Sequence, residues 1–341
     1  MPTTYAIPDG RTVMAATLWT GTGATQSITN TVNGVSFQPD FVWNKSRSTT
    51  YSNEVTDSVR GTTQQLYTNL TDAEYTASNQ LTSFNSNGFT ISTGNNINAS
   101  GQTYVGWQWN AGGSTVTNTS GSISAQVRAN TTAGFSVVTF TAPGGSAQTI
   151  GHGLGVAPRM IIIKSRNNVS GWNTYHASVG NTGALNLQTT GATSTSVDWW
   201  NNTSPTSTVW TIGANINIST WTFVAYCFAP VAGYSAFGSY TGNGSTDGVF
   251  VYLGFRARFL MIKSTSTGGW VMLDTSRDPY NDVDNYLYAN SSAANAGSSN
   301  VLDINSNGFK IRNSWTDING SGTTYIYMAF CENPLKFANA R

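Results

Sequence analysis

A threefold internal repeat runs through this chain and limits the folds open to it. Three stretches each join an apolar run to a Lys-Ser pair and a polar turn; they read FQPDFVWNKSRS, VAPRMIIIKSRN and FRARFLMIKSTS. The lysines of these stretches are Lys45, Lys164 and Lys263, spaced by 119 residues (45 to 164) and 99 residues (164 to 263). Solenoid repeats have periods of roughly 20–50 residues. Spacings this long therefore indicate a whole domain that occurs three times.

Other segments keep step with these lysines. An aromatic residue precedes them by 26, 24 and 23 residues, at Trp19, Phe140 and Tyr240. A closing stretch follows each lysine and reads TYVGWQW, TFVAYCF and TYIYMAF. Copies one and three also share SFNSNGFTIS and DINSNGFKIR, whereas copy two offers only VWTIG at the corresponding place. The repeat is the strongest signal in the sequence.

Composition and alternation indicate β-structure. Only 9% of the residues are charged, against roughly 25% in ordinary soluble domains. Ser, Thr, Asn and Gly supply the polar share, and these residues favour turns and strand faces over helix interiors. In the closing stretch of copy one, Val105, Trp107 and Trp109 fall on one face of a strand by the period of two. The sequence therefore predicts an all-β protein.

The repeat also predicts the domain organisation. We expect three tandem homologous β-sandwich domains of the jelly-roll kind, placed in a row, with the repeated tryptophans and tyrosines as core and interdomain packing. A polar linker, either free or paired at a sheet edge, would join the first two. The expected segments are a leader or docking arm (1–16), repeat 1 (17–113), the linker (114–132), repeat 2 (133–230), repeat 3 (233–334) and a tail (335–341).

Several classes of protein do not fit these residues. The net charge is +1 with no basic cluster, so we expect no nucleic-acid partner. No stretch of about 20 apolar residues is present, and the N-terminus has no secretory pattern, so we expect no membrane insertion and no signal peptide. Cys227 and Cys331 end the closing stretches of two different copies and are expected to be buried free thiols. No Cys/His spacing indicates a metal or cofactor.

The repeated lysines allow two interpretations. Each could contact a ligand such as a glycan. Alternatively, each could cap a strand end or pair with an acid 11 or 12 residues later, which is Asp57 in copy one and Asp274 in copy three. Copy two has His176 at that position, which weakens the pairing there. We favour a structural role, because a feature present in every copy is usually one that the fold requires.

Few residues suggest catalysis or metal binding. His152 stands between glycines without a nucleophile or base nearby, so a structural role is expected. An acidic loop, DTSRDPYNDVDN from Asp274 to Asn285, could offer oxygen ligands to calcium, but its spacing is not that of an EF-hand. A glycosidase needs two flanking carboxylates, and the sequence singles out no such pair. We therefore expect a protein without catalytic residues.

Three tryptophans stand outside the repeated positions. Trp199 and Trp200 lie in VDWWNNTSPTS, and Trp315 lies in NSWTDING. Both segments are rich in Asn and Ser, as expected of loops. Exposed aromatic rings on a β-sandwich can stack on sugar rings. These three are the candidate contacts for a glycan or a partner protein, with core packing as the alternative.

The motifs together resemble a known set of proteins. The segments are IPDGR, MAATLWTG, FQPDFVWNKSRS, DSVRGTTQQLYTN, LTSFNSNGFTIS, YVGWQWNAGG, HGLGVAPRMIIIKSR and YIYMAFCENPLKFANAR. They resemble virion structural or tail-fibre-like proteins of tailed bacteriophages, whose repeat domain is similar to the concanavalin A-like sandwich of lectins. The resemblance covers nearly the whole chain but implies no catalytic residues. Copy two departs from it, since Asn87-Gly88 and Arg60-Gly61 have no counterpart there.

Three functions are compatible with these observations. The first is a non-enzymatic protein on the surface of a bacteriophage particle, a tail or fibre component that attaches to a host glycan or receptor. The second is a capsid decoration or head-fibre protein that docks on the shell with its leader or tail. The third is an enzyme that degrades surface polysaccharide. The resemblance implies other virion proteins as partners and, by analogy, a homotrimer.

Overall fold

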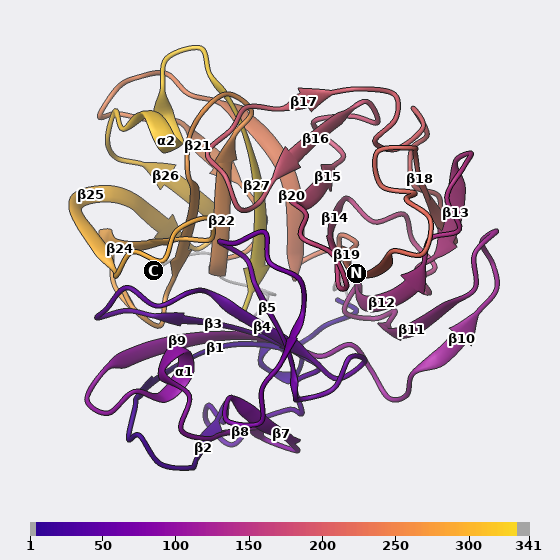
Figure 1. The fold of residues 1–341 in the computed structure, drawn as a ribbon. Helices are drawn as coiled ribbons and strands as arrows, with labels where there is room; N and C mark the ends of the chain where they lie inside the picture. Colours follow the sequence, from indigo (N-terminus) through magenta and orange to yellow (C-terminus); the bar gives the residue numbers. More distant parts are fainter. Residues whose placement is uncertain (1–4, 333–341) are drawn as a thin grey trace.

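The computed structural model describes residues 5–332 and shows an all-β protein built from several antiparallel sheets (Figure 1). The helices among these residues are single turns: η1 (Gly10–Thr12), α1 (Asn95–Asn98) and α2 (Thr316–Asn319). The all-β prediction is therefore confirmed.

The first large sheet has the strand order β1-β9-β3-β4-β5-β6. Its strands are β1 (Met14–Thr20), β3 (Phe41–Ser46), β4 (Glu54–Asp57), β5 (Gln64–Tyr67), β6 (Tyr75–Thr76) and β9 (Thr103–Trp109). A smaller sheet of order β2-β8-β7 accompanies it. Its strands are β2 (Gln26–Thr29), β7 (Leu81–Asn85) and β8 (Gly88–Ile91).

The second large sheet has the order β10-β11-β12-β19-β14-β15-β16-β17. Its strands are β10 (Val116–Asn118), β11 (Ala125–Asn130), β12 (Phe135–Thr141), β14 (Met160–Ser165), β15 (Trp172–His176), β16 (Gly183–Asn186), β17 (Ser194–Thr195) and β19 (Thr222–Phe228). The accompanying pair is β13 (Gln148–Gly151) and β18 (Val209–Ile212).

The third sheet has eight strands and curls until it nearly closes like a barrel, in the order β20-β27-β22-β23-β24-β25-β26-β21. Its strands are β20 (Ser235–Thr241), β21 (Phe250–Tyr252), β22 (Ala257–Ser264), β23 (Trp270–Asp274), β24 (Val283–Tyr288), β25 (Ala296–Asn305), β26 (Gly308–Ile311) and β27 (Thr324–Cys331).

Five strands follow one another in the same order in all three large sheets. These are β1-β9-β3-β4-β5, β12-β19-β14-β15-β16 and β20-β27-β22-β23-β24. The three lysine-bearing stretches form β3, β14 and β22, which are the central strands of these sets. The sequence repeat therefore corresponds to a repeat of strand order.

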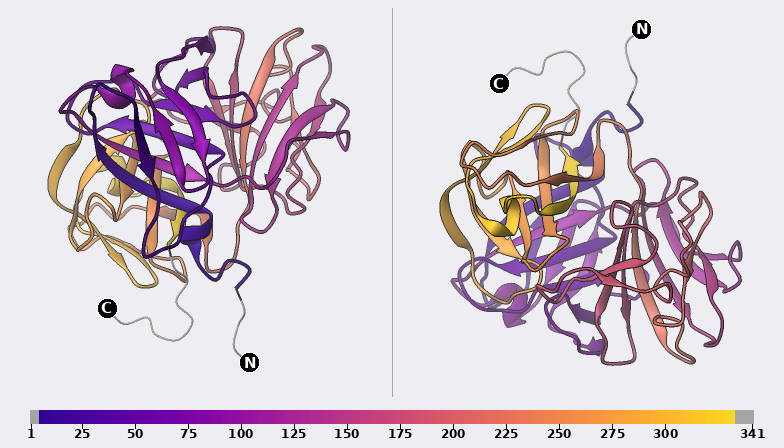
Figure 2. Two further views of the ribbon diagram at one scale, coloured as in Figure 1. Left: turned by 90° about the horizontal axis from the view of Figure 1, so that it is seen from below. Right: turned by 90° about the horizontal axis from the view of Figure 1, so that it is seen from above.

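The expected row of domains is wrong, because the three sheets surround a common centre. Figures 1 and 2 show copy one (indigo to purple), copy two (magenta to salmon) and copy three (orange to yellow) each beside the other two. Ring pairs join the copies: Phe41 and Tyr226 have centroids 4.2 Å apart, and Trp109 and Phe330 have centroids 5.5 Å apart. Phe228 and Phe330, 5.9 Å apart, join the remaining two copies. Each copy therefore contacts the other two, and the three copies form a closed ring.

The shared core explains why the central strands are so apolar. Each central strand is buried on both faces. Side chains such as Trp43 and Trp107 face the common centre, whereas alternate residues of copies one and two face a separate core within their own copy. That inner core contains Val42 and Phe89 in copy one. The packing of repeated aromatic residues in core and interdomain contacts is therefore confirmed.

The segment expected as a linker forms strands. Within 114–132, β11 pairs with β12, and β10 pairs with β11 and forms the edge of the sheet. Between them, Ile123 forms a parallel bridge with Ile150 of β13 and is buried in the core of copy two. The segment therefore closes one side of copy two, which is the edge-paired form of the expectation.

A close backbone approach explains the repeated Ser-Asn-Gly-Phe motif. Gly88 starts β8 with φ +145°, and a Cβ there would lie 2.0 Å from the Ile28 carbonyl oxygen of β2. A Cβ on Gly308 would lie 2.1 Å from the Val251 carbonyl oxygen. Only glycine allows the neighbouring strand to come this close.

Candidate functional site

The repeated lysines hold loops together. Their side chains are buried, and Lys45 donates from Nζ to the carbonyl oxygens of Tyr51 (3.0 Å) and Ser292 (2.8 Å). Lys164 donates to the Ser165 carbonyl oxygen at 2.9 Å, and Lys263 donates to that of Ser266 at 2.9 Å. The lysines therefore cap the ends of their strands.

The alternative pairing of the lysines with acids is wrong. Asp57 accepts instead from Arg60 Nε at 2.5 Å, and Asp274 accepts from Arg277 Nε at 2.7 Å. All four side chains are fully buried. Burial would raise the pKa of Asp274, but the charge and hydrogen bonds of Arg277 hold it below its ordinary value.

Each of these buried acids also receives a hydrogen bond from another copy. The Tyr226 hydroxyl of copy two donates to Asp57 Oδ2 of copy one at 2.9 Å. The Trp107 indole of copy one, at the equivalent place on β9, donates to Asp274 Oδ2 of copy three at 3.1 Å. Two of the three junctions are thus joined through a buried carboxylate, and the bond to an ionised acceptor is a strong one.

The third junction has a neutral counterpart. Copy two has His176 and Val179 where the other copies have the acid and the arginine, and copy three has Met328 where a donor would stand. His176 Nε2 lies 3.2 Å from the Tyr327 carbonyl oxygen, and burial lowers the pKa of His176 to about 4. This junction between copies two and three therefore contains no charge at the equivalent place.

A groove of about 500 Å³ lies at this same junction. Thr190 comes from copy two, and the other lining residues come from copy three. They are Thr267, Gly268, Gly269, Tyr288, Asn290, Ser291, Ala293, Thr316 and Asp317. Backbone hydrogen bonds fix the two sides, since Gly268 N donates to Thr190 O at 2.9 Å and Thr193 N donates to Thr265 O at 2.8 Å.

Two glycines shape the base of the groove. A Cβ on Gly269 would lie 2.2 Å from Cε1 of Tyr288, so glycine at this position leaves the room that the tyrosine ring occupies. The Tyr288 hydroxyl donates to Asp317 Oδ2 at 2.9 Å. The other oxygen, Oδ1, lies 3.2 Å from where a Cβ of Gly268 would stand. The carboxylate therefore borders the space that the glycines leave free.

The single-turn helix α2 positions Asp317. Asn319 accepts from Asn243 N at 3.0 Å and donates to the carbonyl oxygens of Ser245 and Asn313, both at 2.8 Å. Trp315 packs on Tyr286 with ring centroids 4.6 Å apart. This packing holds one end of α2 against the sheet.

A short repeated motif marks this turn, although it did not stand out among the longer repeated segments. It reads Asn-Ile-Asn at 96–98 and 215–217 and Asp-Ile-Asn at 317–319. The last asparagine does the same work in each copy, since Asn98 accepts from Thr22 N and Asn217 accepts from Gly144 N. The first residue of the motif distinguishes the copies, because only copy three has an acid there.

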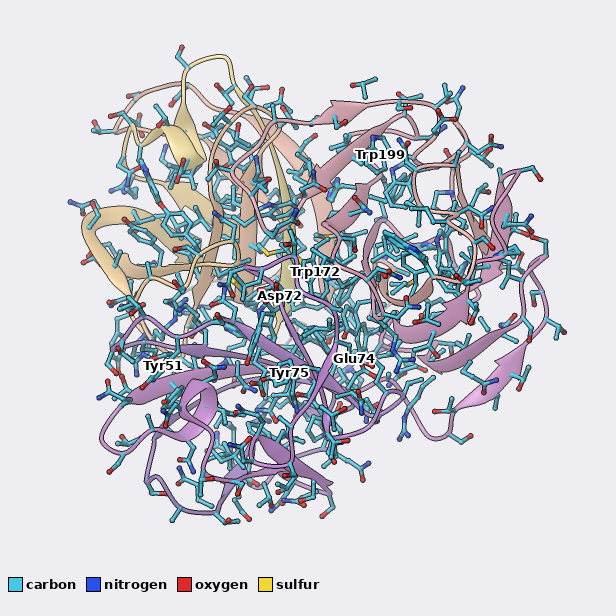
Figure 3. The ribbon with its side chains drawn as sticks, in the orientation of Figure 1. Tyr51, Asp72, Glu74, Tyr75, Trp172 and Trp199 are labelled. Carbon is cyan, nitrogen blue, oxygen red and sulfur yellow. The ribbon has the colours of Figure 1, made fainter. Side chains whose placement is uncertain are left out.

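The candidate tryptophans lie in different surroundings. Trp200 is buried, donates to the Gly183 carbonyl oxygen at 2.8 Å and packs edge-on against Tyr175. It belongs to the core of copy two and has no face for a ligand. Trp199 is half-buried and stands apart from the other labelled residues in Figure 3. Trp315 is half-buried and directly precedes Thr316 of the groove.

An ion pair connects copies one and two across their junction. Arg166 of copy two donates from Nε and Nη2 to Glu74 of copy one, at 3.0 and 2.7 Å to different oxygens. Figure 3 shows Glu74 and Tyr75 near the middle of the molecule, with Trp172 above them. Trp172 donates from its indole to the Tyr67 carbonyl oxygen at 2.8 Å.

The remaining candidates have structural partners. His152 is buried and accepts from Leu154 N at 3.1 Å. In the acidic loop, Asp278 accepts from Asn285 N at 2.8 Å, and Asp282 and Asp284 both accept from Asn300 N. Within residues 5–332, no three His, Cys, Asp or Glu side chains are grouped to hold a metal ion.

Two further expectations concern cysteines and termini. Cys227 and Cys331 are both buried and are not joined in a disulfide, as expected. The expected tail 335–341 and the first four residues of the leader lie outside the described residues. The described part of the chain has no helix long and apolar enough to cross a membrane.

Comparison with known proteins places the chain in a family. No curated protein and no solved structure matches it. A family model described as a domain of unknown function, DUF7483, matches residues 10–334 and so spans all three copies. The chain therefore belongs to the DUF7483 family.

Proposed function

We propose that this protein is a non-enzymatic surface component of a bacteriophage particle that attaches to a host glycan through the groove between copies two and three. The observation that carries the proposal is the groove itself, with Tyr288, Asn290 and Asp317 on its walls. Its volume of about 500 Å³ falls within the roughly 300–1,000 Å³ that is usual for small-molecule sites.

The groove offers the kinds of group that a sugar needs. Tyr288 provides an aromatic ring, and the Asp317 carboxylate provides an acceptor for hydroxyl groups. Asn290 accepts from Trp270 N at 2.8 Å through its Oδ1, which leaves the two N–H groups of its amide as donors. Four aliphatic hydroxyls also line the groove and belong to Thr190, Thr267, Ser291 and Thr316. A sugar ring presents hydroxyls and C–H faces that match this mixture.

The repeat supports the rest of the proposal. We propose that the three equivalent strand sets are tandem copies of one jelly-roll-like sandwich, similar to the concanavalin A-like domain of lectins. A chain with only 9% charged residues avoids nonspecific electrostatic attachment and suits weak contacts repeated over many copies. Repetition on a particle, with a homotrimer as the analogous unit, raises avidity without new contacts. The resemblance to virion and tail-fibre-like proteins is the reason for placing it on a phage.

The proposal is tested with the purified full-length protein on a glycan array and on host cells. We expect binding to a limited set of glycans, and Tyr288→Ala should weaken it by at least about tenfold. Tyr252→Ala is the matched control, because Tyr252 is 67% exposed and lies outside the groove. Equal binding by the two variants, or no binding to glycans and cells, would contradict the proposal.

A second measurement separates attachment from degradation and from shell decoration. Incubation with host capsule or lipopolysaccharide should release no new reducing ends. Labelled antibody against the protein should mark the tail or its fibres on intact particles. Release of reducing ends would indicate an enzyme, and label confined to the head would indicate a decoration protein.

A further inference from the structure

We infer that the groove selects sugars without a carboxylate and rejects acidic sugars, and that Asp317 sets this preference. The inference rests on the proposed function and names the ligand class of the same groove. It begins from charge: Asp317 is the only charged residue among those that line the groove in the described part of the chain.

Lys263, whose charge interacts with that of Asp317, is not available to a ligand. Lys263 is fully buried beneath the turn, and its Nζ donates to the carbonyl oxygens of Ser264 and Ser266. Burial lowers the pKa of Lys263 to about 8, although the charge of Asp317 opposes this. A carboxylate in the groove would therefore meet Asp317 without a cation between them, and like charges a few ångströms apart repel.

A neutral sugar meets the opposite situation. Asp317 Oδ2 accepts from the Tyr288 hydroxyl and lies beside Gly269, whereas Oδ1 borders the space beside Gly268. A sugar hydroxyl that donates to this oxygen forms a charge-assisted hydrogen bond. Side chains at the two glycines would take up the same space, so the turn keeps the carboxylate accessible. The same atom thus favours one class of sugar and disfavours the other.

The other copies provide the comparison. At the position of Asp317, copy one has Asn96 and copy two has Asn215. Asn96 Nδ2 donates to the Tyr67 hydroxyl at 2.6 Å, where Asp317 accepts from Tyr288. An amide therefore fits this turn and keeps the bond to the tyrosine with the direction of donation reversed. Asp317→Asn should fold and should change only the charge.

The experiment compares matched sugars and matched variants. Wild type, Asp317→Asn and Asp247→Asn are tested on paired probes that differ only at C6, such as galactosides with galacturonides and glucosides with glucuronides. Asp247 is the control because it is a surface carboxylate paired with Lys310, outside the groove. Of the two neutral probes, the one that binds more tightly is compared with its acidic partner. Wild type and the control should bind the neutral probe at least about tenfold more tightly than the acidic one. Asp317→Asn should narrow this ratio to within about threefold.

Two outcomes count against the inference alone. One is wild-type binding of acidic probes as tight as that of their neutral partners. The other is an unchanged ratio in Asp317→Asn. Failure of every probe to bind any variant would remove the proposed function, and the inference with it.

Discussion

Glu54 is a carboxylic acid enclosed in the core of copy one. It lies in β4 beside Asn44 of β3, is fully buried, and neither of its oxygens has a hydrogen-bond partner among the described residues. Burial raises the pKa of Glu54 from 4.5 to about 8, and the charge of Arg60 opposes the change only in part. In copy two, Asn173 occupies the corresponding position on β15. An amide is thus compatible with this place in the sheet.

The first prediction follows from this pKa. Between pH 4.5 and 8 the unfolded chain loses the Glu54 proton while the folded protein keeps it, so stability falls as the pH rises through this window. The slope from this one group is at most about 1.4 kcal/mol per pH unit. Urea unfolding at several pH values should show that Glu54→Gln gains on wild type as the pH rises from 5 to 8. Parallel curves for the two proteins would show that Glu54 is not protonated in the folded state.

A second residue-scale prediction concerns Gly88. Its φ of +145° and the 2.0 Å approach of a Cβ to the Ile28 carbonyl oxygen leave no room for a side chain. Gly88→Ala should lower the free energy of unfolding by about 2–4 kcal/mol. Gly113→Ala is the control, because no atom lies within 4 Å of a Cβ there. Similar losses in both variants, measured by urea unfolding, would argue against this explanation of the repeated motif.

At the scale of elements, the segment between copies one and two acts as part of copy two. Ile123 is 8% exposed and packs in its core, whereas Val116 in the same segment is 55% exposed. Ile123→Ala should cost about 2–4 kcal/mol of unfolding free energy. Val116→Ala should cost less than about 0.5 kcal/mol. A linker without a structural role would give two small and equal effects in the same denaturation experiment.

The same segment shows which elements could be predicted from the sequence and which could not. The lysine strands and the closing strands could be predicted, because an apolar run and a period of two depend only on neighbouring residues. The pairing of β11 with β12 was left open, since the alternating pattern of 114–132 is weak. Trp200 could be assigned to a loop or to the core, and its burial depends on Tyr175 and Gly183 across the fold.

At the scale of the whole molecule, the closed ring of three copies was not predicted. Its junctions depend on contacts between distant residues, such as Tyr226 with Asp57, which are 169 residues apart. The sequence does carry a sign of the junctions. Copy two has His176 and Val179 in place of the acid and the arginine, and copy three has Met328 in place of the donor that Tyr226 and Trp107 provide. The changes on both sides of one junction compensate each other, but this is visible only once the partners are known. The groove was missed for the same reason, because two copies contribute to it.

The ring leads to a prediction about its junctions. Tyr226→Phe removes the hydroxyl that donates to buried Asp57 and should cost about 1–3 kcal/mol of unfolding free energy. Met328→Leu, at the equivalent place in the neutral junction, should cost less than about 1.5 kcal/mol because it conserves volume. Urea unfolding of both variants tests the comparison. A larger loss of unfolding free energy from Met328→Leu would show that the hydrogen bond to the buried carboxylate contributes less to stability than packing at the neutral junction.

The most direct test of the account is a crystal structure of the full-length protein with the tightest-binding glycan from the array. We expect the sugar to lie between Thr190 of copy two and Asp317 of copy three, with a hydroxyl donating to Asp317 and its ring against Tyr288. A sugar bound on another surface of the protein, with the groove filled by solvent, would contradict the account.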